Sequence, residues 1–157
     1  MNHSKIRERS LRQLLEDNFK VARHCRKIAE HVIDASLKYY FQNIASRRSQ
    51  FAMEIAEEIS YYGGKEPYMS SSSYDRNRME TGIDDQAAAI KKALKIHKES
   101  LQSYQDALCR IHEGSCREIL LRHKAFIENA IFELKSIKTL LKYVPTNTRN
   151  SSKERAI

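Results

Sequence analysis

Apolar residues recur every three or four positions along four separate stretches of the chain. This spacing is typical of amphipathic helices, which turn one face toward a core. The four stretches cover roughly residues 5–33, 35–62, 84–112 and 116–143. The sequence therefore predicts an all-α protein built from four long helices.

Short polar segments separate the first helix from the second and the third from the fourth. The links near Asp34 and Gly114 hold only a few residues, so each pair should form an antiparallel hairpin. Gly63-Gly64 should end the second helix, because glycine accepts a left-handed conformation. The run Ser115-Cys-Arg-Glu118 has the pattern of a capping box at the start of the fourth helix.

The link between the second and third predicted helices is much longer, about twenty residues from Gly63 to Ile83. A helix of this size is ~40 Å long, while twenty extended residues reach ~65 Å. The link can therefore return from one end of a bundle to the other. We predict two antiparallel hairpins joined by a long crossover; the alternative is a disordered linker between hairpins that pack differently.

The length of 157 residues suits one domain with a real core. We predict a single bundle over residues 1–144 and a disordered basic tail over 145–157. The net charge is +8, and half of it lies in residues 1–10 and 144–157, each with three basic residues against one acidic residue. Such tails permit binding to nucleic acid or an acidic partner, but they also simply keep a chain soluble.

No apolar leader and no long uncharged run is seen, so we expect neither a signal peptide nor contact with a membrane. Three cysteines form an odd set, and we expect reduced thiols. Together these observations favour a cytoplasmic protein.

The segment 37–67 carries the most telling motif, Phe41-x-x-Ile44-Ala45-x-x-Arg48-x-x-Phe51 followed by Gly63-Gly64. With this motif the chain resembles the ferritin-like superfamily over roughly residues 8–143, more weakly over 93–108 and 127–137. It most resembles a bacterial family of small four-helix bundles with no assigned function. The resemblance implies an antiparallel bundle of ferritin-like topology.

Active members of that superfamily hold two metal ions with one Glu from each of two helices and Glu-x-x-His from the other two. By resemblance, the ligand positions correspond to Asn18 on the first helix, Arg48 and Phe51 on the second, and His97 on the third. On the fourth helix the register is open, either Glu128 and Ile131 or a frame nearer His123. No Glu-x-x-His occurs anywhere in the chain. An arginine in place of a carboxylate would repel cations, so the resemblance does not extend to the metal ligands.

Four polar residues fall on the inward stripes of their helices: Asn18, Arg48, His97 and His123. A buried arginine needs a counter-charge and hydrogen bonds. We predict an interior polar network in which Glu128 pairs with Arg48, and Asn18 and His97 lie nearby. Its role would be to fix the helix register; the alternative is a small anion or ligand bound against Arg48 and the histidines.

The run Cys109-x-x-His112-x-x-x-Cys116 offers a weak zinc candidate, because zinc takes cysteine and histidine ligands. Only three ligands converge there, however, and two ordinary cysteines with a surface histidine explain the run as well.

These observations favour a non-catalytic structural or interaction module without a cofactor, with a homodimer or another protein as candidate partner. The alternative is a residual metal-binding, di-iron-like oxidoreductase or an iron-handling stress protein. A third interpretation is a stress protein that associates with DNA through its basic tails.

Overall fold

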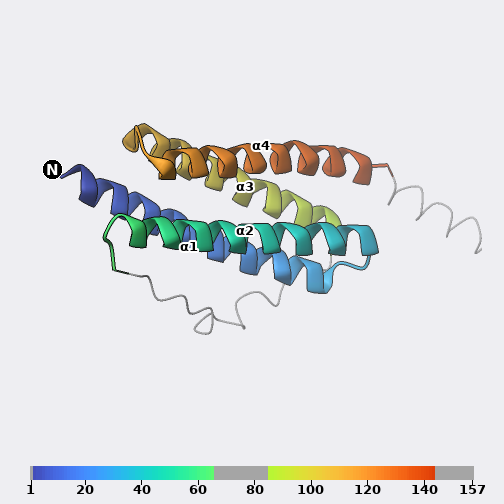
Figure 1. Ribbon diagram of the computed structural model, residues 1–157. Coiled ribbons are helices and arrows are strands. Elements are labelled where there is room, and N and C mark those ends of the chain that lie inside the picture. Colours follow the sequence, from blue (N-terminus) through green and yellow to red (C-terminus); the bar gives the residue numbers. More distant parts are fainter. Residues whose placement is uncertain (1, 66–84, 144–157) are drawn as a thin grey trace, which may run out of the picture.

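The computed structural model describes residues 2–65 and 85–143, and these form four long helices without a strand. The helices are α1 (His3–His31), α2 (Ala35–Tyr61), α3 (Gln86–Arg110) and α4 (Ser115–Leu141). Together they make an all-α four-helix bundle (Figure 1), which confirms the predicted fold class. Each predicted boundary lies within two residues of the observed one.

Three of the four helices begin at a side chain that accepts a hydrogen bond from the first turn. Asn2, Asp34 and Asp85 cap α1, α2 and α3 in this way. The predicted capping box at the start of α4 is wrong. Gly114, with φ of 98°, precedes that helix without a side-chain cap, and the Ser115 hydroxyl instead donates to a carboxylate oxygen of Glu58 on α2 at 3.0 Å.

The four helices alternate in direction where they pack (Figure 1). α1 runs antiparallel to both α2 and α3, and α4 runs antiparallel to α3. As a consequence α2 and α3 point the same way, so α2 ends at the opposite end of the bundle from where α3 begins. Most of the predicted crossover, Gly63 to Ile83, lies outside the described residues, as does the predicted tail, residues 145–157.

One apolar core runs the length of the bundle, made of leucine, isoleucine and alanine from all four helices. Burial of each leucine or isoleucine side chain stabilises the fold by about 1.5–3 kcal/mol. The largest fully buried side chain, however, is a cation, Arg48, followed by Tyr104. A polar layer therefore crosses the middle of an otherwise apolar interior.

The three cysteines are free, and they lie in different surroundings. Cys25 and Cys116 are buried, whereas Cys109 is exposed. Burial raises the pKa of the Cys25 thiol to about 12, although the nearby Arg48 acts in the opposite direction. No helix within the described ranges is long and apolar enough to cross a bilayer.

Candidate functional site

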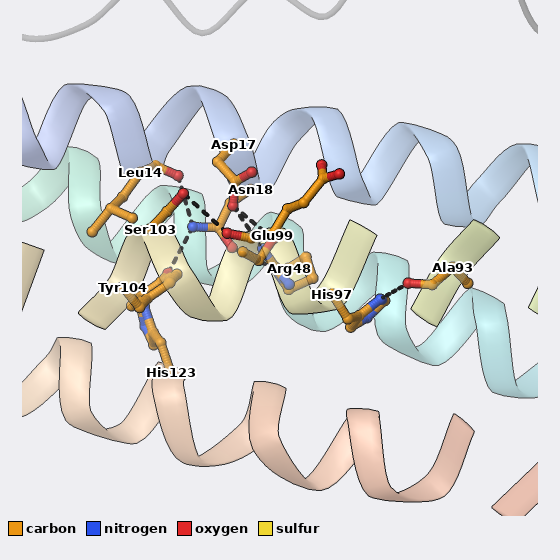
Figure 2. Close-up of polar contacts among 11 residues, drawn as sticks. Leu14, Asp17, Asn18, Arg48, Ala93, His97, Glu99, Ser103, Tyr104 and His123 are labelled. Atoms are coloured by element: carbon orange, nitrogen blue, oxygen red, sulfur yellow. Dashed lines mark hydrogen bonds and ion pairs between the residues drawn. The ribbon is translucent and has the colours of Figure 1, made fainter. Parts of the chain in front are cut away.

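Arg48 lies at the centre of the polar layer, with none of its side chain exposed. It projects inward from the middle of α2, where the helical repeat places it on the same face as Phe41, Ile44 and Ile55. Its Nε donates to the Asn18 Oδ1 at 2.5 Å. One of its terminal nitrogens, Nη2, donates to Asp17 and to Ser100, at 3.1 and 2.9 Å. Figure 2 shows Asp17 and Asn18 of α1 beside Arg48.

Asp17 supplies the counter-charge for this buried guanidinium. Its carboxylate accepts from Arg48 and also from the Ser100 hydroxyl, the latter at 2.8 Å. The Asp17 side chain is 24% exposed, whereas that of Arg48 is fully buried. The acid therefore stays in contact with solvent, which lowers the cost of bringing the ion pair into the core.

A chain of hydrogen bonds leads away from Arg48 on its other side. The Asn18 side-chain nitrogen donates to the Leu14 carbonyl at 2.8 Å and to the Tyr104 hydroxyl at 2.7 Å. The Tyr104 hydroxyl pairs with His123 Nδ1 at 2.9 Å, and His123 Nε2 pairs with a Glu54 oxygen at 2.9 Å. We call the series Arg48, Asn18, Tyr104, His123 and Glu54 the hydrogen-bond chain.

In every link of the hydrogen-bond chain, the donor is the residue that stands nearer to Arg48 in the series. Since the Tyr104 oxygen accepts from Asn18, its proton goes to His123 Nδ1. His123 then carries its own proton on Nε2 and donates it to the Glu54 carboxylate. The dipoles thus align from a cation, Arg48, to an anion, Glu54, and aligned bonds polarise and strengthen one another.

The hydrogen-bond chain also touches all four helices. Arg48 and Glu54 belong to α2, Asn18 to α1, Tyr104 to α3 and His123 to α4. The series therefore leaves α2, visits the three other helices and returns to α2 about two turns further along.

Burial sets the protonation of this chain. It lowers the pKa of His123 to about 4, although Glu54 acts in the opposite direction, so the imidazole is neutral at pH 7. Burial also raises the pKa of the Tyr104 phenol. For Glu54, burial alone would raise the pKa, but the hydrogen bonds from His123 and Arg122 outweigh it and lower the pKa.

Phe51 covers the imidazole from one side. Its ring stacks on His123 with 3.8 Å between centroids and 11° between planes. Phe126 packs edge-on against Phe51 at 5.3 Å, and the guanidinium of Arg47 lies 5.2 Å from the Phe126 centroid. Because Phe51 follows Arg48 by three residues, both reach the interior on one face of α2.

On the other side of Arg48, three nitrogens have no hydrogen-bond partner within the described residues. The second terminal nitrogen of Arg48, Nη1, is buried without a hydrogen bond, as are the Nε2 atoms of His97 and His24. His97 bonds only through Nδ1, to the Ala93 carbonyl at 2.8 Å (Figure 2). We call these three nitrogens the unpaired cluster.

The unpaired histidines are neutral. Burial lowers the pKa of His97 to about 4, and the positive charge of Arg48 acts in the same direction. Burial lowers the pKa of His24 to about 4 as well, with further contributions from Lys92 and Lys20. His24 makes a further, smaller contribution to the lowered pKa of His97.

The structure places four of the five predicted network residues in the interior: Asn18, Arg48, His97 and His123 are all fully buried. Asn18 bonds Arg48 directly, while His123 reaches it through Tyr104 and Asn18. His97 makes no hydrogen bond to Arg48. On α4, His123 and Ile131 are buried, whereas Glu128 is exposed.

The predicted pairing of Glu128 with Arg48 is wrong. Glu128 is half exposed and pairs with Lys124, one turn earlier on α4, at 3.2 Å. Its Cα lies on the flank of the apolar stripe, so its side chain points to solvent, where a surface lysine is within reach. The counter-charge comes from Asp17 instead.

Four residues of the network escaped the sequence analysis: Asp17, Glu54, Ser100 and Tyr104. Tyr104 lies on the apolar stripe of α3, where its ring is indistinguishable from ordinary core. The usable signal was its hydroxyl, since a buried tyrosine usually finds a partner. Asp17 and Glu54 lie at the edges of their stripes, where only the helix packing decides whether a carboxylate turns inward.

Nothing in the described residues resembles a metal centre. No group of three His, Cys, Asp or Glu side chains there converges to hold an ion. In the zinc candidate, Cys116 is buried while Cys109 and His112 are exposed, so the three side chains do not face a common point. At the centre of the bundle a guanidinium stands among the polar groups, and it repels cations.

A comparison with curated proteins finds no match to this sequence. A family model does match, over residues 7–110, which span α1, α2 and α3. The match covers about two thirds of the chain, and the protein therefore belongs to the family described as a domain of unknown function, DUF2383.

Proposed function

We propose that this protein is a non-catalytic bundle of the ferritin-like superfamily, in which the polar network replaces the di-metal centre. Its role is that of a structural or interaction module of the cytoplasm. The parallel course of α2 and α3, with antiparallel neighbours on either side, supports the ferritin-like topology. The four inward polar positions supply the correspondence with the ligand sites of metal-binding bundles.

The observation that carries the proposal is Arg48, fully buried where the four helices meet. Two of its three nitrogens already donate to Asn18, Asp17 and Ser100. A di-metal site needs several carboxylates at this point. Among residues 2–65 and 85–143, Asp17 is the only carboxylate that pairs with Arg48, and it neutralises the guanidinium.

The hydrogen-bond chain supports a register-setting role. Sliding one helix by a single turn displaces it by about 5.4 Å, which exceeds any hydrogen bond in the chain. Apolar side chains alone tolerate such a slip better, because one leucine packs much like another. Asn18, which bonds both Arg48 and Tyr104, holds α1 in place.

Metal analysis tests the replacement of the di-metal centre. Protein purified from cells supplemented with iron and zinc should contain far less than one ion per chain. A matched variant, Asn18→Glu/Arg48→Glu/Phe51→His, restores carboxylates and a Glu-x-x-His pattern on α2 and should bind more metal than the parent. Stoichiometric iron or manganese in the parent, lost on removal of a network residue, would contradict the proposal.

The outer face of α4 supports self-association. Leu121 and Phe132 are 44% and 69% exposed, and Ala125 lies between them on the same face. If two copies pack α4 antiparallel with Leu121 opposite Phe132, then Glu118 falls opposite Lys135, because Glu118 precedes Leu121 by three residues and Lys135 follows Phe132 by the same number. Both charged residues are exposed. One symmetric pairing thus matches apolar to apolar and acid to base, so we propose a homodimer through this face.

Sedimentation of purified protein tests the dimer. Phe132→Ser should shift the equilibrium toward the monomer, whereas Tyr39→Ser, an exposed aromatic of α2, should leave it unchanged. The charge reversal Glu118→Lys should weaken association, and adding Lys135→Glu should restore it. A monomer at every concentration, or weakening by both reversals together, would contradict this interface.

A further inference from the structure

The unpaired cluster is the one part of the interior that the proposed structural role leaves without a purpose. Arg48 Nη1 and His97 Nε2 belong to side chains with no exposed surface, and His24 is only 5% exposed. Buried donors and acceptors almost always find partners, because an unpaired one is costly. Arg48 of α2 and His97 of α3 lie next to each other in the polar layer (Figure 2), so one partner can serve both of their unpaired nitrogens.

The chemistry of the two central atoms is fixed by their surroundings. His97 Nδ1 contacts the Ala93 carbonyl, which can only accept, so Nδ1 carries the proton. The imidazole is neutral at pH 7, since burial and Arg48 hold its pKa at about 4. Its Nε2 is therefore a bare acceptor. Arg48 Nη1 can only donate.

This polarity excludes two classes of ligand. A metal ion suits the lone pair of His97, but it would lie beside the positive charge of Arg48. A simple anion suits the guanidinium, but it would face the lone pair of His97, and Asp17 already balances the charge of Arg48. What remains is a neutral group that accepts from Arg48 and donates to His97, and a hydroxyl does both.

We propose that Arg48 Nη1 and His97 Nε2 together bind one small hydroxyl compound, either water or an alcohol of similar size. The site does not depend on the register-setting role, and it would exist in a bundle with any function.

A crystal structure at near-atomic resolution, together with ¹⁵N spectra of the histidines, tests the site. The expected result is one oxygen atom within hydrogen-bond distance of both nitrogens. The Nε2 resonance of His97 should show an accepted hydrogen bond rather than a bare lone pair. Exposed His31 serves as the reference ring, since its Nδ1 bonds Lys27 in the way that His97 bonds Ala93.

Probe compounds distinguish the sources of the hydroxyl. In a methanol titration, saturable movement of the His97 Nε2 resonance identifies an alcohol site, while no movement leaves water as the ligand. His97→Phe should remove the bound oxygen from Arg48 in crystals of the variant, and Glu128→Gln should leave it in place. Crystals grown in bromide test the anion.

Three results would overturn the proposal. The first is a bromide peak at Arg48 Nη1. The second is a direct contact between Arg48 and His97 with no oxygen between them. The third is a bare Nε2 resonance with no density beside it. The metal analysis of the parent protein has a separate readout, so a failure of either proposal leaves the other standing.

Discussion

The two sides of Arg48 use the same kinds of side chain in opposite ways. On one side Asn18, Tyr104, His123 and Glu54 satisfy one another in a single directed series. On the other side His97 and His24 each leave a ring nitrogen without a partner among the described residues. Composition does not distinguish them, since each side holds buried imidazole.

The two sides differ in whether a neighbouring helix places a hydrogen-bond partner at the same height along the bundle as the histidine ring. His123 faces Tyr104 on α3 and Glu54 on α2, so both of its nitrogens are bonded. His97 faces Arg48, another donor-rich group, and finds only its own helix at Ala93. A complete network positions helices, whereas an incomplete one is where a small molecule can bind.

Acidification should give the largest effect on stability. His24, His97 and His123 are held at a pKa of about 4 in the folded state, below the ordinary 6.5. Between these values the unfolded chain binds more protons, so stability falls as the pH drops from 6.5 toward 4. At pH 5 the loss relative to pH 7 should be about 2 kcal/mol for each histidine, by denaturant unfolding at the two pH values.

The same measurement sharpens the comparison. Glu54 can stabilise a protonated His123, whereas Arg48 opposes protonation of His97. Burial nevertheless brings both pKa values to about 4, so His97→Phe and His123→Phe should each flatten the pH dependence by a similar amount. A flat profile in the parent, or flattening by only one of the two variants, would contradict this expectation.

Arg48→Met should give the next largest loss, about 3–5 kcal/mol at pH 7 in urea unfolding, because it leaves Asp17 and Asn18 without their buried partner. The matched control is Arg47→Met, on the same helix but exposed, and it should change stability by less than about 1 kcal/mol. Equal stability of the parent and the Arg48→Met variant would contradict a structural role for the polar network.

A pair of isosteric changes compares the two sides directly. Tyr104→Phe removes one hydroxyl and leaves Asn18 and His123 each short of a bond, so it should cost about 1–3 kcal/mol. His97→Phe removes a ring whose Nε2 has no partner among the described residues. Its loss of unfolding free energy should therefore be smaller than that of Tyr104→Phe. The reverse order in thermal or urea unfolding would show that the partners of His97 matter more than the hydrogen-bond chain.

Glu128→Gln should have the smallest effect, less than about 0.5 kcal/mol, since its pairing with Lys124 is on the surface. Asp17→Asn, by contrast, removes the formal counter-charge of Arg48 and should cost more. A larger loss for Glu128 than for Asp17 in paired unfolding curves would restore the pairing first predicted.

The fold could be predicted from the sequence because helical periodicity is a local signal. The stripes and the residues at Asp34 and Gly63 placed the helix ends closely. The same stripes identified Asn18, Arg48, His97 and His123 as inward residues, since a polar residue on an apolar stripe is informative wherever the helix packs. The membership of the family rests on the matched segment 7–110.

The partners could not be predicted, because they depend on how far each helix is shifted along its neighbour. Asp17 and Glu128 occupy similar flanking positions, yet only Asp17 lies level with Arg48 and next to α3. Tyr104 was hidden among core residues for the same reason. The apolar stripe of a helix predicts which face a residue occupies. Its hydrogen-bond partners depend on how a neighbouring helix is shifted along the bundle and rotated about its axis.

Cys25 gives the interior a built-in reporter of its own opening. The thiol is buried beside Arg48, and burial keeps it protonated and therefore inert toward alkylating reagents while the helices stay together. Cys109, on the surface, reacts without any such motion. The ratio of the two labelling rates thus measures how often the centre of the bundle opens to solvent, without a mutation or an added dye.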